Sequence, residues 1–430
     1  MPHSQEFKRC SHLLAGIALI SLVLGGCATT STKTVETDPT EVAEEHIELD
    51  PMLVRVKNRD TLETETLDVE ELFTEAYVAY QNRRYEEAVR HYDVIIAYFP
   101  TSRFYLPALY NGGLAYEQLQ YWDQAAKNYQ RIIEAFPDQK EAIDAHYRLA
   151  NVFQELGNYA EVVELMTLIL LRDLEHFDRI EAHLRRANAL RELGELTEAE
   201  QAYRTLLRLN DDAPEDQKIS EDAHFLVQSY FGIGRIYHMR VGEIRLVLPP
   251  ERMGDDLQEK AELFLRAQSN YIRALRYHHP HWSVAAGYMI GKMYEDFYMD
   301  MFRAEIPDDL TEEQVILYFE ELGRQIKPLM ERAIQVYERN LSLSQRIVRT
   351  DEAEKWIEAT AMHLTRMRAF LNDPTLQQRA QKLVVSGRDI DDLWDLQGLA
   401  RHFVQEALGE ARRKADENKE LQSNLEGPTF

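Results

Sequence analysis

The sequence predicts an all-α protein, built as a solenoid of helix–turn–helix units with two elongated units and a C-terminal helical cap. The first observation behind this prediction is a pair of small or aliphatic residues twelve positions apart, which recurs at Ala76/Ala88, Gly113/Ala125, Ala150/Val162 and Ala187/Ala199. A twelve-residue offset leads up one helix and partway down the next, so both residues would lie where two antiparallel helices cross. The second observation is composition, because modest glycine and proline and 10% aromatic residues suit a well-packed helical chain.

The second unit carries the most specific pattern, with Gly113, Tyr116, Ala125, Tyr129 and Pro137. These residues resemble the tetratricopeptide repeat, which has Gly or Ala at position 8, Tyr at 11, Ala at 20, an aromatic residue at 24 and Pro at 32. The resemblance implies four such units over residues 69–211.

The other three units follow this pattern to different degrees. The first repeats it with Leu72, Ala79, Tyr92, Ile95 and Pro100. The third departs from it at Val162 and Met166, and the fourth has Arg186 where an apolar residue is usual.

Residues 212–350 are expected to form two extended units. Gly234 and Tyr271 look like the first and second helix of one, and Gly291 and Tyr337 repeat the arrangement. The extra residues, 242–257 and 300–318, are expected to emerge as loops on one face and to contribute to binding. The alternative is an ordinary helical domain with accidental repeat echoes.

Residues 351–430 are expected to form a helical cap followed by a charged tail, because the last unit of a solenoid has no neighbour on one face. The cap would bury the last unit with four apolar side chains, Trp356, Leu364, Phe370 and Trp394.

The N-terminus predicts a secretory signal over residues 1–26. Lys8 and Arg9 precede an apolar run too short to span a bilayer, which ends in Leu24-Gly25-Gly26-Cys27. The last four residues resemble the bacterial lipobox, which implies acylation of Cys27 after cleavage before it. The alternative is that Cys27 is merely a small residue near an ordinary cleavage site.

Residues 27–68 are then the lipidated cysteine and a flexible tether, rich in Thr and Glu up to about residue 50. Met52, Val54 and Val56 alternate in a way that indicates a short strand. Since Ala28 follows the cysteine, the resemblance implies an outer-membrane lipid anchor facing the periplasm, with inner-membrane retention less favoured.

Charge and motifs exclude several classes of function. A net charge of −25 repels nucleic acid, so we expect no nucleic-acid partner. The chain lacks the usual signatures of nucleophilic, phosphate-binding or zinc sites, so we expect no enzyme activity, cofactor, metal or small-molecule substrate. The closest candidate, His278-His279-Pro280-His281, is interpreted as a turn between units, with a metal site as the alternative.

A partner would bind in a groove lined by the first helix of each unit. The repeat pattern places aromatic, amide and guanidinium side chains there: Phe73, Tyr77, Tyr80, Tyr110, Asn111, Leu114, Tyr147, Arg148, Asn151, Arg185 and Asn188. The Asn and Arg positions partly resemble the carboxylate clamp of peptide-binding tetratricopeptide domains, although Tyr110 replaces its usual Lys. A peptide or helix in an aromatic groove, and a merely solvated surface, are the alternatives.

Together these features indicate a lipid-anchored periplasmic scaffold that binds envelope proteins or peptides in assembling or maintaining a cell-envelope complex. In plan it resembles the outer-membrane tetratricopeptide lipoproteins, which include BamD of the β-barrel assembly machine, the pilotins of secretins and lipoproteins of gliding-motility complexes. A BamD-like assembly factor and a CpoB-like peptidoglycan coordinator are the alternatives, and an envelope hydrolase is the least favoured.

Overall fold

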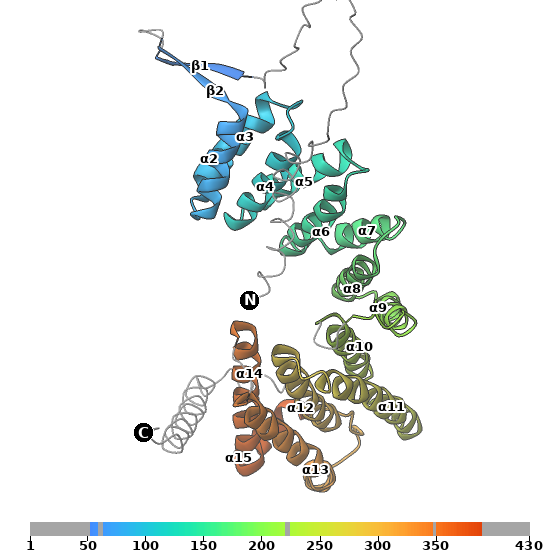
Figure 1. Ribbon diagram of the computed structural model, residues 1–430. Coiled ribbons are helices and arrows are strands. Elements are labelled where there is room, and N and C mark those ends of the chain that lie inside the picture. Colours follow the sequence, from blue (N-terminus) through green and yellow to red (C-terminus); the bar gives the residue numbers. More distant parts are fainter. Residues whose placement is uncertain (1–51, 59–62, 220–223, 347–349, 389–430) are drawn as a thin grey trace, which may run out of the picture. The chain divides into compact units, whose positions relative to one another are not determined.

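The computed structural model describes residues 52–58, 63–219, 224–346 and 350–388. Within these ranges the chain forms two strands followed by fourteen helices, which pack against one another in chain order (Figure 1). The predicted signal segment, Cys27, Trp394 and the charged tail lie outside the described residues.

The first described element is an antiparallel hairpin of β1 (Met52–Asn58) and β2 (Glu63–Asp68). The strand expected from the alternation at Met52 and Val54 is therefore confirmed, but the structure differs from the expected tether, which extended to residue 68. The second strand leads directly into the first helix. Its last residue, Asp68, caps that helix by accepting hydrogen bonds from the backbone N–H groups of Glu70 and Glu71, at 2.8 and 3.2 Å.

Eight helices form four short helix–turn–helix units. They are α2 (Val69–Gln81) with α3 (Tyr85–Tyr98), α4 (Tyr105–Gln118) with α5 (Trp122–Ala135), α6 (Lys140–Glu155) with α7 (Tyr159–Ile169), and α8 (His176–Glu192) with α9 (Leu196–Asp211). Each tight turn needs a left-handed residue. Gly157 and Gly194 supply it without strain, at φ 75° and 83°, whereas Arg83 and Gln120 adopt it at φ 60° and 59°.

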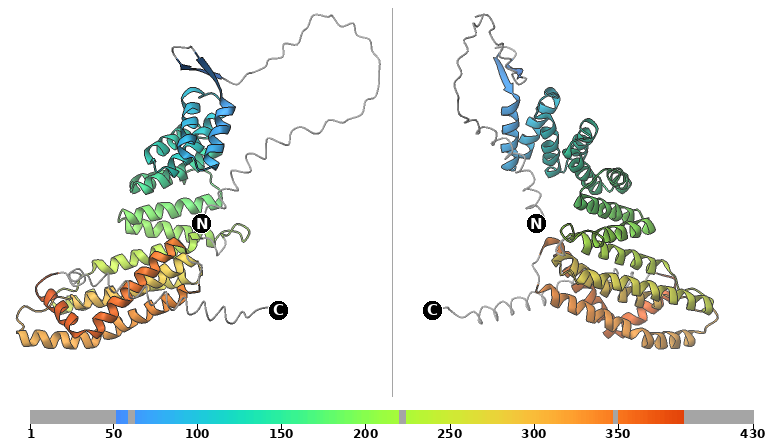
Figure 2. Two further views of the ribbon diagram at one scale, coloured as in Figure 1. Left: turned by 90° about the vertical axis from the view of Figure 1, so that its left-hand side faces the viewer. Right: turned by 45° about the vertical axis from the view of Figure 1, so that its right-hand side comes forward.

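Four longer helices form two long units, α10 (His224–Glu243) with α11 (Pro250–Leu275) and α12 (Pro280–Phe302) with α13 (Glu312–Ser344). The prediction that the insertions emerge as loops is wrong for most of their length. Pro250 occupies the first turn of α11, where its missing N–H costs nothing, and Thr311 with Gln314 forms a capping box that starts α13. The extra residues therefore lengthen the helices, as the long helices in Figure 2 show.

The loops that remain, 244–249 and 303–311, bind each other. The backbone N–H of Glu305 donates to the Leu246 carbonyl at 3.0 Å. The Glu305 carboxylate in turn accepts from the backbone N–H of Leu248 at 2.7 Å. Because each loop satisfies polar groups of the other, the ends of the two long units are fixed together.

A contact between glycine and tyrosine closes both short and long units. A Cβ atom on Gly113 would lie 2.6 Å from the Tyr129 ring, one on Gly234 would lie 2.8 Å from the Tyr271 ring, and one on Gly291 would lie 2.4 Å from the Tyr337 ring. Only glycine permits so close an approach. The prediction that the helices of Gly234 and Tyr271, and those of Gly291 and Tyr337, form two extended units is thus confirmed.

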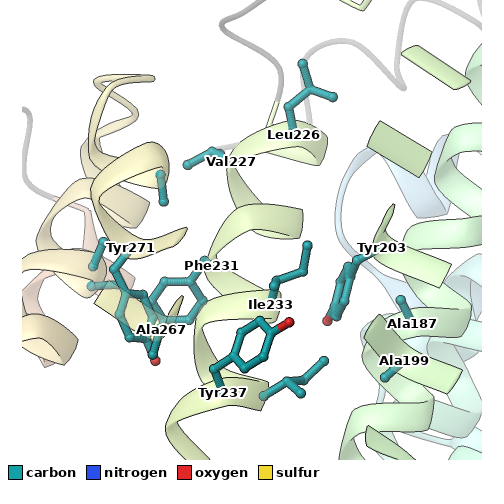
Figure 3. Close-up of a cluster of buried hydrophobic side chains, with 14 of the residues drawn as sticks. Ala187, Ala199, Tyr203, Leu226, Val227, Phe231, Ile233, Tyr237, Ala267 and Tyr271 are labelled. Atoms are coloured by element: carbon teal, nitrogen blue, oxygen red, sulfur yellow. The ribbon is translucent and has the colours of Figure 1, made fainter. Parts of the chain in front are cut away.

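The hydrophobic core continues from the short to the long units. In Figure 3, α10 carries Phe231 toward Tyr271 of α11 on one side, while Tyr203 and Ala187 of the preceding unit lie on its other side. Gly232 of α10 accommodates the Tyr203 ring, since a Cβ there would lie only 2.4 Å from it.

The chain then continues into α14 (Asp351–Asn372) and α15 (Pro374–Val385), which pack against the last unit. Leu364 and Phe370 are buried in this contact and Trp356 is partly buried, so these three members of the predicted cap are confirmed.

Candidate partner-binding face

The first helices of the six units are α2, α4, α6, α8, α10 and α12, and we call the surface that their side chains form the first-helix face. In the first two units this face is aromatic. The ring of Phe73 lies 5.1 Å from that of Phe104, and the ring of Tyr110 lies 6.1 Å from that of Tyr129. Tyr80, Asn111 and Leu114 are also half-buried, whereas Tyr77 is 37% exposed. Tyr77 is therefore the most exposed of the predicted groove residues.

In the third and fourth units the predicted arginines are already paired within the chain. Arg148 lies 3.4 Å from the Glu117 carboxylate of the preceding first helix, and Arg185 lies 2.6 Å from Glu181. Arg185 also donates to the side-chain oxygen of Asn151. A terminal carboxylate captured by these arginines would have to replace the chain's own acceptors.

The remaining predicted residues of these units are held by hydrogen bonds. The Tyr147 hydroxyl donates to the Asp178 carbonyl at 2.5 Å, and its ring lies 5.5 Å below the Arg185 guanidinium. The side-chain oxygen of Asn188 accepts from the Tyr203 hydroxyl at 2.5 Å. Many of the predicted residues thus already have a structural role within the chain.

Tyrosines at position 11 of the pattern tie two of the first helices, α4 and α10, to the preceding unit. The Tyr116 hydroxyl donates to Asp93 at 2.6 Å, and the Tyr237 hydroxyl donates to Glu200 at 2.6 Å. Although burial opposes it, hydrogen bonding from Tyr237, Arg204 and Arg240 lowers the pKa of the Glu200 carboxyl. These bonds fix the spacing between successive first helices, and hence the face that they present.

The long units add a hollow that the sequence did not reveal. It has a volume of about 270 Å³ and lies between α10 and α12, lined by Arg235, His238, Met239, Val241, Gly242, Met289, Asp296 and Asp300. The repeat pattern could have pointed to Arg235. It follows Gly234 as the predicted groove residue Asn188 follows Ala187, so the two residues occupy the same position of the repeat.

Ion pairs hold the wall of this hollow in place. Asp296 accepts from Lys292 and lies 3.1 Å from His238, while Asp300 lies 2.7 Å from the fully buried Lys260. Burial works against ionisation of Asp296, but the hydrogen bond from His238 and the Lys292 charge lower its pKa overall. Burial raises the pKa of the Asp300 carboxyl, and the Lys260 charge acts against that rise. Each carboxylate of the hollow thus has a lysine of the chain as its partner.

Below this face, a buried acid joins the last unit to the cap. The Glu295 carboxylate is 6% exposed, accepts from the Tyr337 hydroxyl at 2.7 Å and lies 2.9 Å from Nδ1 of His363 on α14. Nε2 of His363 lies 3.2 Å from the Tyr288 hydroxyl, whose pKa burial raises to about 12. Sequence reasoning missed this contact because no periodicity links α12 to α14.

The histidine cluster forms a turn between units, as interpreted. His278 has a φ of 51°, and Pro280 opens α12. Nδ1 of His279 and Nδ1 of His281 are buried and make no hydrogen bond. Among the residues that the structure describes, no three His, Cys, Asp or Glu side chains are grouped to hold a metal ion. No helix in the same ranges has the length and hydropathy of a membrane span.

Comparison with known proteins decides the type of repeat. A family model described as a tetratricopeptide repeat matches residues 73–139 and 177–214. The fold is a tetratricopeptide-repeat solenoid. Solenoids of this kind bind protein partners, which is the function class that the repeat supports for this chain.

Several solved structures are similar to parts of this chain. A tetratricopeptide protein from Parabacteroides merdae is 16% identical, with 68% of this chain and 98% of that chain covered and a TM-score of 0.37. The C-terminal part of a repeat protein from Cytophaga hutchinsonii is 11% identical, with 70% and 97% covered and a TM-score of 0.39. MamA from Desulfovibrio magneticus is 13% identical, with 47% and 94% covered and a TM-score of 0.32. No curated protein matches the chain.

Proposed function

We propose that this protein is a lipid-anchored periplasmic scaffold that holds partner proteins of a cell-envelope complex on its first-helix face. The observation that carries the proposal is the composition of that face. An exposed tyrosine stands beside half-buried aromatic rings in the first units, and arginine and amide groups follow in the next units. Aromatic and arginine side chains are the types that dominate protein–protein contacts, and the repeat fold is one that usually binds partners and does not catalyse.

The proposed anchor rests on the lipobox-like Leu24-Gly25-Gly26-Cys27. Two or more acyl chains on Cys27 would give stable attachment, since each buried methylene contributes about 0.8 kcal/mol. The residues between Cys27 and the hairpin would then set how far the repeats reach from the membrane. Ala28 favours the outer membrane in this scheme, with retention in the inner membrane as the other outcome.

The test is site-specific photo-crosslinking in cells, with the crosslinker at Tyr77 on the first-helix face. Tyr98 on α3 is the matched control, because it is also an exposed tyrosine, at 61% against 37% for Tyr77. We expect envelope proteins to be captured from Tyr77 and not from Tyr98. Capture of the same proteins from both positions, or from neither, would contradict a specific face.

The anchor is tested separately by Cys27→Ser, compared with Cys10→Ser. We expect the Cys27 variant alone to lose metabolically incorporated fatty acid and to leave the membrane fraction. If it kept both, the cysteine would not be the anchor, although the scaffold proposal would still stand.

The identity of the captured proteins distinguishes the remaining alternatives. Capture of β-barrel assembly components would favour a BamD-like assembly factor, and secretin, pilus or motility components would favour those machines. Capture of peptidoglycan synthases would favour a CpoB-like coordinator. An envelope hydrolase would instead release fragments from purified peptidoglycan without any partner.

A further inference from the structure

The first-helix face contains a cation in the long units, Arg235, that forms no ion pair with a carboxylate of the described chain. From α4 onward, neighbouring first helices are joined across this face by polar links. Glu117 pairs with Arg148, Asn151 with Arg185, and His238 with Asp296. Between α8 and α10 the pattern changes, because Arg191 and Arg235 are close enough for their charges to repel each other.

Only one of these two arginines forms an ion pair in the described ranges, although the Glu192 charge also acts on Arg235. Arg191 lies 2.7 Å from the Glu192 carboxylate. Arg235 makes no ion pair with any described residue, although it is partly buried. Burial, reinforced by the Arg191 charge, lowers the pKa of Arg235. A partly desolvated guanidinium without a counter-ion is unfavourable for the isolated protein, so its presence calls for an explanation other than stability.

The hollow beside Arg235 gives that charge access to a ligand. Asp296 and Asp300 also line it, but Lys292 and Lys260 neutralise them, so Arg235 is the charge left over. Met239, which is 40% exposed, and Met289 supply the apolar part of the wall. Methionine adapts its shape to different apolar side chains. With about 270 Å³, the hollow is smaller than a typical small-molecule site of about 300–1,000 Å³, and it suits a single side chain with its neighbours.

We propose that the hollow between α10 and α12 binds an aspartate or glutamate side chain of a partner protein, with apolar residues flanking that acid against Met239 and Met289. The two oxygens of the carboxylate would accept two parallel hydrogen bonds from the Arg235 guanidinium, a geometry that arginine offers and lysine does not. The inference rests on the proposed scaffold function and adds to it a site and a partner chemistry. It places recognition in the long units, away from the aromatic face of the first two.

The test is binding of the purified full-length protein to a peptide array. Otherwise identical nonapeptides carry Glu or Gln at the centre, flanked by Leu or Met. Because the protein has a net charge of −25, non-specific electrostatics would favour the Gln peptides. We expect the opposite, with at least about tenfold more protein retained by the best Glu peptides than by their Gln counterparts. Equal retention, or preference for Gln, would overturn the proposal.

Variants then assign the effect to Arg235. Arg235→Gln is expected to abolish the preference for Glu, and Arg235→Lys to weaken it. Arg324→Gln, which removes a 75% exposed arginine on α13, should leave it intact. A preference for Glu that survives Arg235→Gln would show that the acid binds elsewhere. Free glutarate added at the peptide concentration should not compete, and full competition by it would indicate a small-molecule site instead.

A stability measurement separates a binding role from a structural one. Arg235→Met removes a partly buried charge that has no counter-ion, so we expect its melting temperature to be equal to or above that of the wild type while the preference for Glu is lost. Loss of stability in this variant would mean that Arg235 supports the fold, and the proposal would fail. Crosslinking from Tyr77 does not depend on this site, so the scaffold function can fail or succeed independently.

Discussion

The second and sixth units use the same three residues in different surroundings. In the second unit Gly113 accommodates Tyr129, whose hydroxyl donates to Glu117 at 2.6 Å. In the sixth unit the equivalent residues are Gly291, Tyr337 and Glu295, with a hydroxyl–carboxylate distance of 2.7 Å. The two acids differ in what else they bind. Glu117 faces Arg148 on the next first helix, whereas Glu295 is buried against His363 of the cap. The same glycine–tyrosine–glutamate contact thus joins one unit to the next in the second unit, and joins the last unit to the cap in the sixth.

The difference follows from what comes next along the solenoid. An internal unit is covered by another unit, so its acid can reach the first-helix face and pair with an arginine there. The last unit needs a cap, because otherwise one face would remain exposed. Here α14 supplies an imidazole to the acid, and the amide nitrogen of Asn340 on α13 donates to the Thr360 hydroxyl of α14 at 3.0 Å. The cap is therefore fixed by buried polar contacts as well as by apolar packing.

Replacing the two acids should show the largest contrast between these units. Glu295→Ala leaves the Tyr337 hydroxyl and a His363 nitrogen without their partner in a buried site, which we expect to cost about 3 kcal/mol. Glu117→Ala also deprives the Tyr129 hydroxyl of its acceptor, but the Glu117 side chain is more exposed, at 13% against 7% for Glu295, so we expect a smaller cost of about 1 kcal/mol. Urea unfolding can be followed by Trp122 in the second unit and by Trp282 and Trp356 near the sixth. Equal losses would show that burial of Glu295 contributes nothing extra.

Adding a methyl group at the two glycines should give the next largest effect. The new Cβ would lie 2.4 Å from the Tyr337 ring in Gly291→Ala and 2.6 Å from the Tyr129 ring in Gly113→Ala. Overpacking costs about 1–3 kcal/mol, and we expect the sixth unit to lie at the upper end because its tyrosine is held by a buried acid. Gly323→Ala on α13 is the control. Its Cβ meets nothing within 4 Å, so helix propensity should stabilise that variant by up to about 1 kcal/mol. A destabilised control would invalidate the comparison.

Much of this architecture was predictable, for a physical reason. A close contact between Gly234 and Tyr271, or Gly291 and Tyr337, requires residue types that recur in the sequence, so the long units could be recognised. The insertions were misinterpreted because prolines suggested loops, whereas Pro250 is compatible with the first turn of a helix.

The candidate site was less predictable than the fold. The aromatic and amide positions follow the repeat, but whether Arg148 or Arg185 is free depends on acids from other helices. Likewise Glu295 and His363 are 68 positions apart in the sequence, and the repeat pattern does not predict that they meet. The lack of a counter-ion at Arg235 is a property of the folded surroundings and leaves no trace in the local sequence.

The tyrosines that tie neighbouring units should give a smaller contrast. Tyr237→Phe removes a hydrogen bond to Glu200, an acid that also binds Arg204 and Arg240, so the remaining partners still satisfy it. Tyr116→Phe leaves Asp93, whose pKa burial raises, without that donor. We expect losses of about 0.5 kcal/mol for the first and about 1–1.5 kcal/mol for the second in urea unfolding. The reverse order would mean that the arginine pairs at Glu200 depend on the tyrosine.

A histidine in the fourth unit provides the smallest contrast, through pH. Burial, aided by Arg186 and Arg179, lowers the pKa of His183 to about 4, and its Nδ1 makes no hydrogen bond. In the unfolded chain the pKa is about 6.5, so protons bind preferentially to the unfolded state. The free energy of unfolding therefore has its full value above pH 6.5, where the imidazole is neutral in both states, and it decreases progressively as the pH falls toward 4.

Because His183 is only partly buried, we expect a loss of about 1 kcal/mol between pH 7.5 and pH 5. His183→Leu should remove this part of the acid sensitivity, whereas His278→Asn, at an exposed turn, should not. Urea unfolding of both variants at the two pH values measures the difference. An unchanged acid response in His183→Leu would place the pH dependence elsewhere in the chain.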